Sequence, residues 1–228
     1  MIPAIEIDNL YFKYKGQSDY ILNGINLNIQ RGEVLAIVGL SGNGKSTLCY
    51  TLNGIIPNTF KGNLQGNVKI FGENVRDMNM AKLATIIGVV FQDPDTQLFS
   101  PTVEDEIAFG PENLCIPREE IAVRIDEVLK LTGMEKYRYH NPNNLSGGEK
   151  QLIALAGVLS LEPNILVFDE AMAQIDDRGK GIIKRVIRRL KDDGKTIVMI
   201  EHDFNNLDVA DRVILLKNGK LNEFKGEL

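Results

Sequence analysis

The hydrophobic residues of this chain follow patterns that predict several kinds of strand. Ile25, Leu27 and Ile29 alternate with polar residues, as in a strand with one buried face. Asn218-Gly219, shortly after Leu215-Leu216, favours a tight hairpin turn. Helical patterns separate four runs that are almost wholly apolar, which predicts a buried parallel sheet with crossover helices behind an N-terminal antiparallel layer. These four runs are residues 34–38, 86–91, 165–168 and 196–200.

The middle of the chain has a helical period instead. Pro117 is placed to open a helix and Gly133 to end it. The apolar stripe of that helix is Ile121, Ile125, Val128 and Leu129. We expect one domain over residues 1–228, with an inserted helical lobe within a catalytic core. The core comprises about residues 1–92 and 163–228, and the lobe about residues 93–162.

Composition and charge narrow the class of protein. Hydrophobic residues make up 43% and charged residues 25%, as in a globular protein that is neither disordered nor membrane-embedded. The net charge of -5 argues against nucleic acid as a partner, and the basic run at residues 184–191 is interpreted as a solvated helix face. The first eight residues lack the features of a secretory signal. Two cysteines in a chain of this length fit a reducing compartment.

A phosphate-binding loop is predicted directly after the strand at residues 34–38. Its glycines allow several N–H groups to point into one concavity, and the next helix adds the positive end of its dipole. We expect Lys45 to reach the β- and γ-phosphates and Ser46 to offer its hydroxyl to Mg²⁺. The expected nucleotide-binding residues here are Gly39, Ser41, Gly42, Asn43, Gly44, Lys45, Ser46 and Thr47.

An acidic pair, Asp169-Glu170, follows the buried strand at residues 165–168. Ligands of open α/β sheets lie outside the carboxyl ends of the strands, so both carboxylates are expected to face the phosphates. Asp169 fits a Mg²⁺ partner, acting through water because Mg²⁺ dehydrates reluctantly. Glu170 is expected to orient the attacking water and to act as the general base of hydrolysis.

A second glycine-rich helix start, the signature segment, lies at residues 145–151 and reads Leu-Ser-Gly-Gly-Glu-Lys-Gln. With the phosphate loop before it and Asp169-Glu170 and His202 after it, the chain resembles the ATP-binding subunit of an ABC transporter over nearly its whole length. The resemblance implies an α/β fold, a P-loop NTPase of ABC type, with a RecA-like mixed sheet core, an N-terminal antiparallel β layer and an inserted helical lobe. It also implies hydrolysis of ATP with Mg²⁺.

Three more residues take their expected roles from this resemblance. Gln92, directly after the strand at residues 86–91, corresponds to the glutamine that touches Mg²⁺ and the attacking water. His202 corresponds to the switch histidine that contacts the γ-phosphate. Tyr14 is similar to the aromatic residue that stacks on adenine. For Tyr14, packing within its own β layer stays open as an alternative.

The signature segment also bears on assembly. In the family it binds a γ-phosphate held by the opposite subunit, so the resemblance implies a homo- or heterodimer of ATPase subunits arranged head to tail around two ATP molecules. The residues concerned are Ser146, Gly147, Gly148 and Glu149, with Asp176 communicating between the two sites. An alternative is an ordinary capped helix with Ser146 and Glu149 in a capping box, which leaves Gly147-Gly148 unexplained.

Within the family, residues 92–99 and 102–113 are similar to the energy-coupling factor subgroup, whose importers take up vitamins or transition-metal ions such as cobalt and nickel. This resemblance implies that the helix from Val103 to Asn113 borders a docking groove for a transmembrane coupling subunit, on the cytoplasmic face of the cell membrane. Replacing Ala108 by Arg is expected to weaken that docking. Members of the subgroup usually carry a further C-terminal dimerisation segment, whereas this sequence ends at Leu228. Three explanations stay open: a trimmed chain, half of a fused pair, or a shorter variant.

Two other function classes stay open. One is a non-transport ABC ATPase of the translation or DNA-repair type, which would keep the nucleotide motifs. No coiled-coil heptad run of the repair type is seen, and 228 residues cannot hold the two cassettes of the translation type. The other is a nucleotide-gated binding module without turnover, which would be expected to lack Glu170.

Overall fold

The computed structural model describes residues 2–226, so Met1 and residues 227–228 of the expected domain lie outside the described residues. The N-terminal part forms an antiparallel sheet in the order β2-β1-β4-β5. Its strands are β1 (Ile5–Tyr14), β2 (Leu22–Ile29), β4 (Gly62–Ile70) and β5 (Glu73–Asn74). Ile25, Leu27 and Ile29 are buried while Asn26 and Asn28 are exposed, which confirms the predicted alternation.

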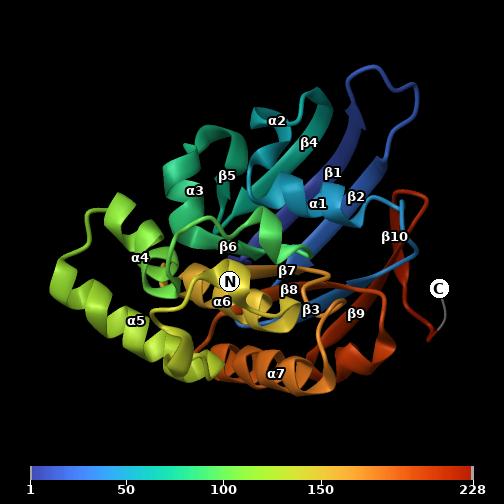
Figure 1. Ribbon diagram of the computed structural model, residues 1–228. Helices are drawn as coiled ribbons and strands as arrows, with labels where there is room; N and C mark the ends of the chain where they lie inside the picture. Colours follow the sequence, from blue (N-terminus) through green and yellow to red (C-terminus); the bar gives the residue numbers. More distant parts are fainter. Residues whose placement is uncertain (1, 227–228) are drawn as a thin grey trace.

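A mixed sheet in the order β10-β9-β3-β8-β7-β6 forms the centre of the molecule (Figure 1). Neighbouring strands from β9 to β6 are parallel, and β10 is antiparallel to β9. All residues of β3, β7 and β8 are buried, as the apolar runs predict. The strands are β3 (Val34–Val38), β6 (Ile87–Val90), β7 (Ile165–Asp169), β8 (Thr196–Glu201), β9 (Arg212–Lys217) and β10 (Lys220–Glu223).

The sheet register brings chemically important strand ends together. Val38 pairs with Glu201, and Asp169 pairs with Ile200. The carboxyl ends of β3, β7 and β8 therefore meet at one edge, where α/β sheets bind ligands.

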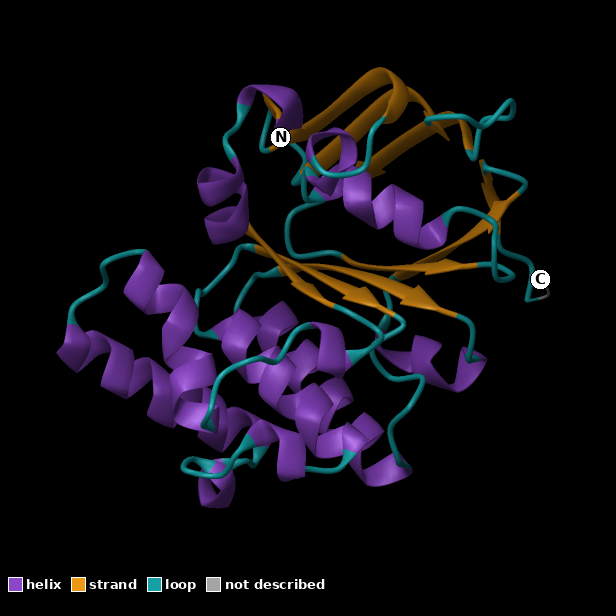
Figure 2. Cartoon of the chain, turned by 45° about the horizontal axis from the view of Figure 1, so that its top comes forward, coloured by secondary structure: helices purple, strands orange, loops and turns teal. Residues whose placement is uncertain are grey.

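Helices lie in two layers around the mixed sheet (Figure 2). Helix α1 lies between the two sheets, and the longer helices α4 to α7 lie on the opposite face of the mixed sheet. The α-helices are α1 (Lys45–Leu52), α2 (Ile55–Asn58), α3 (Met80–Ile86), α4 (Val103–Asn113), α5 (Arg118–Thr132), α6 (Gly147–Leu159) and α7 (Asp177–Asp192). The 3-10 segments are η1 (Val75–Asp77), η2 (Pro94–Thr96), η3 (Glu135–Tyr137), η4 (Pro142–Asn144) and η5 (Phe204–Val209).

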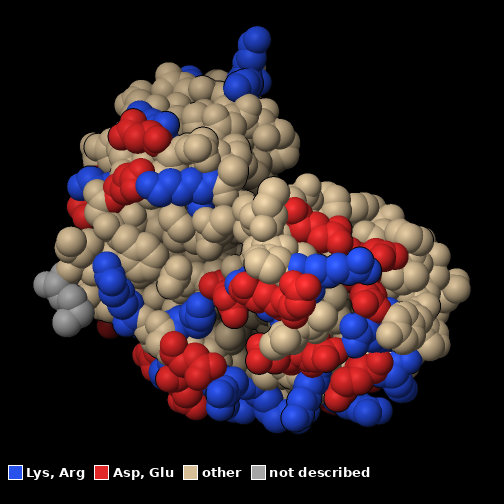
Figure 3. Space-filling model, turned by 90° about the vertical axis from the view of Figure 1, so that its left-hand side faces the viewer, with Lys and Arg blue, Asp and Glu red and all other residues tan. Residues whose placement is uncertain are grey.

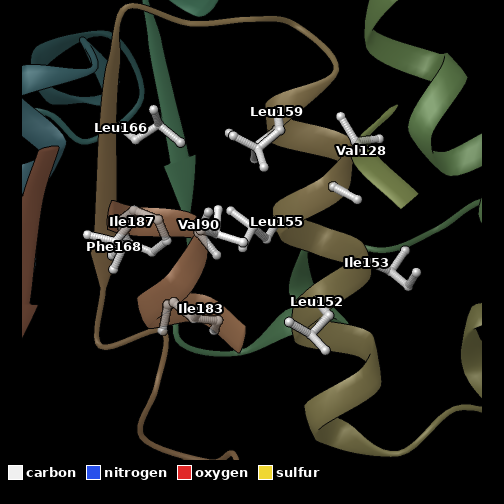
Figure 4. Close-up of a cluster of buried hydrophobic side chains, with 14 of the residues drawn as sticks. Val90, Val128, Leu152, Ile153, Leu155, Leu159, Leu166, Phe168, Ile183 and Ile187 are labelled. Carbon is white, nitrogen blue, oxygen red and sulfur yellow. The ribbon is translucent and has the colours of Figure 1, made fainter. Parts of the chain in front are cut away.

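Two hydrophobic clusters hold these layers together. One fills the space between the two sheets and includes Leu48 of α1. The other joins α4, α5 and α6 to α7 and the facing side of the mixed sheet; in Figure 4, Leu155 of α6 lies close to Val90 of β6, and Ile187 of α7 close to Phe168 of β7. The helical segment thus shares a core with the sheet, and the division into lobe and catalytic core stays a prediction.

Several basic residues of α7 lie at the surface and form ion pairs there. Lys184 and Arg188 form ion pairs with Asp208 of η5, and Lys191 forms one with Asp211. On the face drawn in Figure 3, basic side chains are interspersed with acidic ones and form no continuous basic surface. Among the described helices, none combines the length and apolar character needed to cross a membrane.

Candidate functional site

The phosphate loop connects β3 to α1 as predicted. Gly42 and Gly44 have φ values of 82° and 95°, in the left-handed region that favours glycine. Gly44 precedes the first residue of α1, and a Cβ there would lie 3.0 Å from the carbonyl oxygen of Ile21. Glycine therefore lets the chain turn tightly into the helix while the loop lies close to the N-terminal layer.

Lys45 lies inside this loop and is only 5% exposed. Its ammonium donates hydrogen bonds to the carbonyl oxygens of Gly39 at 2.9 Å and Leu40 at 3.2 Å. It also lies 3.2 Å from Oε1 of Glu170. The structure thus brings the two residues with the sharpest predicted roles into direct contact.

Ser46 and Asp169 form a second pair. The Ser46 hydroxyl donates to Oδ1 of Asp169 at 3.1 Å. Burial raises the pKa of Asp169, and the charge of Glu170 adds to this, while the Ser46 hydrogen bond and Lys45 oppose it. Hydroxyl and carboxylate oxygens are the hard ligands that Mg²⁺ prefers, so the chemistry of this pair fits the predicted ion.

Glu170 has an unusual backbone for a non-glycine residue, with φ at 52°. Such conformations cost free energy and concentrate at functional sites. Its N–H donates to the carbonyl oxygen of Ile200 at 3.1 Å, which fixes the turn after β7 against β8. Oε2 lies 3.6 Å from Nδ1 of His202, which is 51% exposed. The Glu170 carboxylate therefore lies between Lys45 and His202.

Gln92 is exposed and follows β6, the neighbour of β7. Two glutamines for which the sequence predicts no such role hold the backbone just before Gln92. Gln151 of α6 donates to the carbonyl oxygen of Phe91 at 2.8 Å, and Gln97 contacts both Phe91 and Val89. Gln151 is 2% exposed, and an amide on the otherwise apolar face of a predicted helix was a signal that could have identified it.

Tyr14 lies beside the phosphate loop, where its hydroxyl shares a hydrogen bond with the Thr47 hydroxyl at 3.0 Å. Its ring packs edge-on against Phe12 and Phe60. These contacts are those of the packing alternative, and they also place the ring next to the loop, as adenine stacking requires. The role of Tyr14 stays a prediction.

The signature segment begins α6 with a complete capping box. Ser146 accepts a hydrogen bond from the N–H of Glu149, whose carboxylate accepts from the N–H of Ser146. Hydrogen bonds from Tyr137 and then from Ser146 lower the pKa of Glu149. The capping alternative is thus correct as local structure.

The two signature glycines differ in their surroundings. A Cβ at Gly148 would lie 3.0 Å from Cγ2 of Ile175, so close packing accounts for this glycine. A Cβ at Gly147 would meet no described atom within 4 Å. Capping and packing within the chain therefore leave Gly147 unexplained.

Asp176 lies near this segment and caps α7 by accepting from the N–H of Gly179 at 2.8 Å. Ser146, Gly148, Glu149 and Asp176 line one cavity of about 360 Å³. The structure therefore gathers the expected residues into two groups, one around Lys45 and Asp169 and one around Ser146 and Asp176. Within residues 2–226, no residue of the group around Lys45 and Asp169 lines that cavity, so the two groups occupy separate places.

Comparison with known proteins identifies the fold that carries these groups. A family model described as "ABC transporter" matches residues 22–173, which is more than half of the chain. The chain belongs to the ABC transporter ATP-binding family. A solved structure described as cbiO1 from Clostridium perfringens, part of the ABC transporter complex cbiONQ, matches with a TM-score of 0.86 and 37% identity, over 97% of this chain and 88% of that chain.

Curated relatives agree with this membership. An energy-coupling factor transporter ATP-binding protein, EcfA1, of Ligilactobacillus salivarius is 43% identical over 95% of this chain and 76% of its own length. A putative ABC transporter ATP-binding protein of Methanosarcina acetivorans is 44% identical over 95% of this chain. The chain spans only 34% of that Methanosarcina relative.

Proposed function

We propose that this chain binds and hydrolyses ATP to power a membrane importer of the energy-coupling factor type, for a vitamin or a transition-metal ion. The observation that carries the ATPase part is the continuous line from Lys45 through Glu170 to His202, beside the Ser46–Asp169 pair. The importer part is supported by similarity to the Ligilactobacillus and Clostridium proteins. This similarity favours a transporter over the non-transport alternative.

In the proposed reaction, the loop from Gly39 to Thr47 binds the phosphates and Lys45 neutralises charge on the β- and γ-phosphates. Glu170 accepts a proton from the attacking water, and His202 contacts the γ-phosphate. Mg²⁺, held by Ser46, Asp169 and Gln92, would neutralise phosphate charge. The raised pKa of Asp169 does not conflict with this, because a bound cation favours the ionised carboxylate.

Replacing Lys45 by Ala is expected to lower ATP affinity by about tenfold or more, since a loss near 1.4 kcal/mol corresponds to tenfold. The Lys45 ammonium is the buried cation of the phosphate loop. Equilibrium binding of a fluorescent ATP analogue measures the effect. Lys130→Ala, at an exposed lysine on α5, is the matched control. Equal affinity of Lys45→Ala and the wild type would mean that the loop has another ligand.

For assembly, we propose a head-to-tail pair of ATPase subunits in which Ser146, Gly147, Gly148 and Glu149 of one subunit reach the γ-phosphate bound to the other. The exposed, unobstructed surface at Gly147 supports this arrangement. Asp176, at the start of α7 and in the same cavity as Ser146, is positioned to communicate between the two sites.

A transmembrane coupling subunit is proposed to dock near α4. Phe99 and Phe109 are 63% and 47% exposed, and their rings meet edge-to-face at 4.7 Å. Glu106 fixes this pair, because its carboxylate accepts hydrogen bonds from the N–H groups of Phe99 and Ser100. Paired exposed aromatic rings on a fixed backbone are typical anchors of a protein interface. Docking of this kind would place the chain on the cytoplasmic face of the membrane.

The expectation that Ala108→Arg would weaken docking specifically is wrong. Ala108 is only 7% exposed and belongs to the core shared by α4 and α6, so Ala108→Arg would disrupt packing. Phe109 is the suitable position. Phe109→Asp is expected to reduce co-purification with the membrane subunits by about tenfold, the scale of one lost anchor. Basal ATPase activity should persist. Val123→Asp, on the exposed face of α5, is the control, and equal recovery of both variants would argue against this docking surface.

A further inference from the structure

Glu201 is a buried acidic residue that the proposed reaction does not use. It is the last residue of β8, directly before His202, and is 1% exposed. Oε2 accepts a hydrogen bond from the side-chain amide of Asn206 at 3.2 Å. Oε1 has no hydrogen-bond partner among the described residues. A buried oxygen without a partner costs free energy, so the residue needs a reason beyond packing.

The strand pattern places Glu201 on the α7 side of the mixed sheet. Side chains alternate along a strand, and Met199 of β8 belongs to the cluster that contains α7. Ile200 belongs instead to the cluster on the α1 side. Glu201 therefore lies beneath the switch histidine, on the face of the sheet that α7 covers.

The segment after His202 is fastened to α7 by charged side chains. Lys180 pairs with Asp203 at 3.2 Å, Lys184 donates to the carbonyl oxygen of Asn205 at 2.5 Å, and Arg188 pairs with Asp208 at 2.6 Å. The Glu201–Asn206 hydrogen bond fastens the same segment to the end of β8. His202 lies between these attachments, 3.6 Å from the Glu170 carboxylate.

We propose that Glu201 is a positioning residue, which acts through Asn206 to hold His202 beside Glu170. The proposal rests on the ATPase site proposed above, to which it adds a residue. Because His202 is half exposed, its place depends on the chain on either side. Glu201 is the residue directly before His202, and Asn206 anchors the segment that follows it.

The charges around Glu201 favour its neutral form. Asp203 and Glu170 are negative, and the nearby cation Lys180 is paired with Asp203. Burial raises the pKa of Glu201 to about 7, Asp203 and Glu170 add to the rise, and Asn206 and Lys180 oppose it. Below that pH the Glu201 carboxyl is neutral, and the segment after His202 stays attached to α7. Above it, the ionised carboxylate competes with Asp203 for Lys180 and loosens the attachment to α7.

Histidine NMR tests the positioning role without ATP hydrolysis. The chain has two histidines, so His140, which packs on Tyr137, serves as the internal reference for His202. At about pH 6, below the Glu201 pKa, Glu201→Ala is expected to shift the His202 imidazole signals, and Glu201→Gln should restore them because its amide oxygen can accept from Asn206. At about pH 8.5, the wild type should differ from Glu201→Gln. If Glu201→Ala does not fold, the comparison of the wild type with Glu201→Gln tests the proposal. His202 signals that are the same in these two proteins at both pH values would overturn it.

ATPase assays on the full chain provide the second readout. The ratio of kcat for Glu201→Gln to kcat for the wild type is expected to rise about threefold between about pH 6 and about pH 8.5, because only the wild type ionises at this position. KM for Mg-ATP should change little. Glu119→Gln, at an exposed position on α5, is the matched control and should give a flat ratio. A flat ratio for Glu201→Gln in an active enzyme contradicts this inference alone, whereas a wild type inactive at every pH contradicts the proposed ATPase.

Discussion

Replacing Glu170 by Gln is expected to lower steady-state ATP hydrolysis by at least about 100-fold, the usual size of a general-base contribution. The amide has nearly the same shape as the carboxylate but cannot accept a proton from the attacking water. It also removes the negative charge beside Lys45, 3.2 Å away. Mg-ATP affinity should therefore stay equal or increase. Phosphate release measures the first quantity, and equilibrium nucleotide binding measures the second.

The matched control is Glu119→Gln, the same chemical change at an exposed position on α5. It should leave both quantities unchanged. Turnover by Glu170→Gln close to that of the wild type would remove the assigned role from this carboxylate. Loss of nucleotide binding as well would point to a structural role in the unusual backbone turn at φ 52°.

The fold could be predicted where local chemistry decides the structure. Pro117 precedes α5, and Gly133 ends it with φ at 71°, because each residue has a backbone preference suited to its position. The Asn218-Gly219 turn joins β9 to β10 for the same reason, with positive φ at both residues. The buried strands were also predictable, because an uninterrupted apolar run leaves few other structures possible.

Contacts between elements distant in sequence could not be predicted in this way. On α4, Ala108 is buried and Phe109 is exposed, the reverse of what residue size alone favours. The packing of α4 against α6 decides which face is covered. The same holds for Glu201, whose unpartnered oxygen depends on how η5 and α7 meet β8. Of the candidate site, the residue types and their order were readable, while the Lys45–Glu170 contact required the three-dimensional structure.

The second large effect is expected at Gly147, where the composite site can be tested without disturbing the single chain. Gly147 is exposed, begins α6 and has open space around its missing Cβ, so an arginine there fits the isolated subunit. In a head-to-tail dimer, however, the same side chain would fill the space that the partner's γ-phosphate needs. In the Glu170→Gln background, Gly147→Arg is therefore expected to abolish ATP-dependent dimer formation.

Size-exclusion chromatography with light scattering, with and without Mg-ATP, measures this outcome. Ala122→Arg adds the same side chain on the exposed face of α5 and should leave the dimer intact. Ser146→Ala shows the effect of weakening the start of α6 without adding bulk, because it removes only the helix cap, worth about 1 kcal/mol. If Gly147→Arg alone prevents dimer formation while its unfolding midpoint stays close to that of the parent, steric exclusion at the interface is the cause. An ATP-dependent dimer that forms normally in the Gly147→Arg variant would place the signature segment away from the partner's phosphate, and Gly147 would then need another explanation.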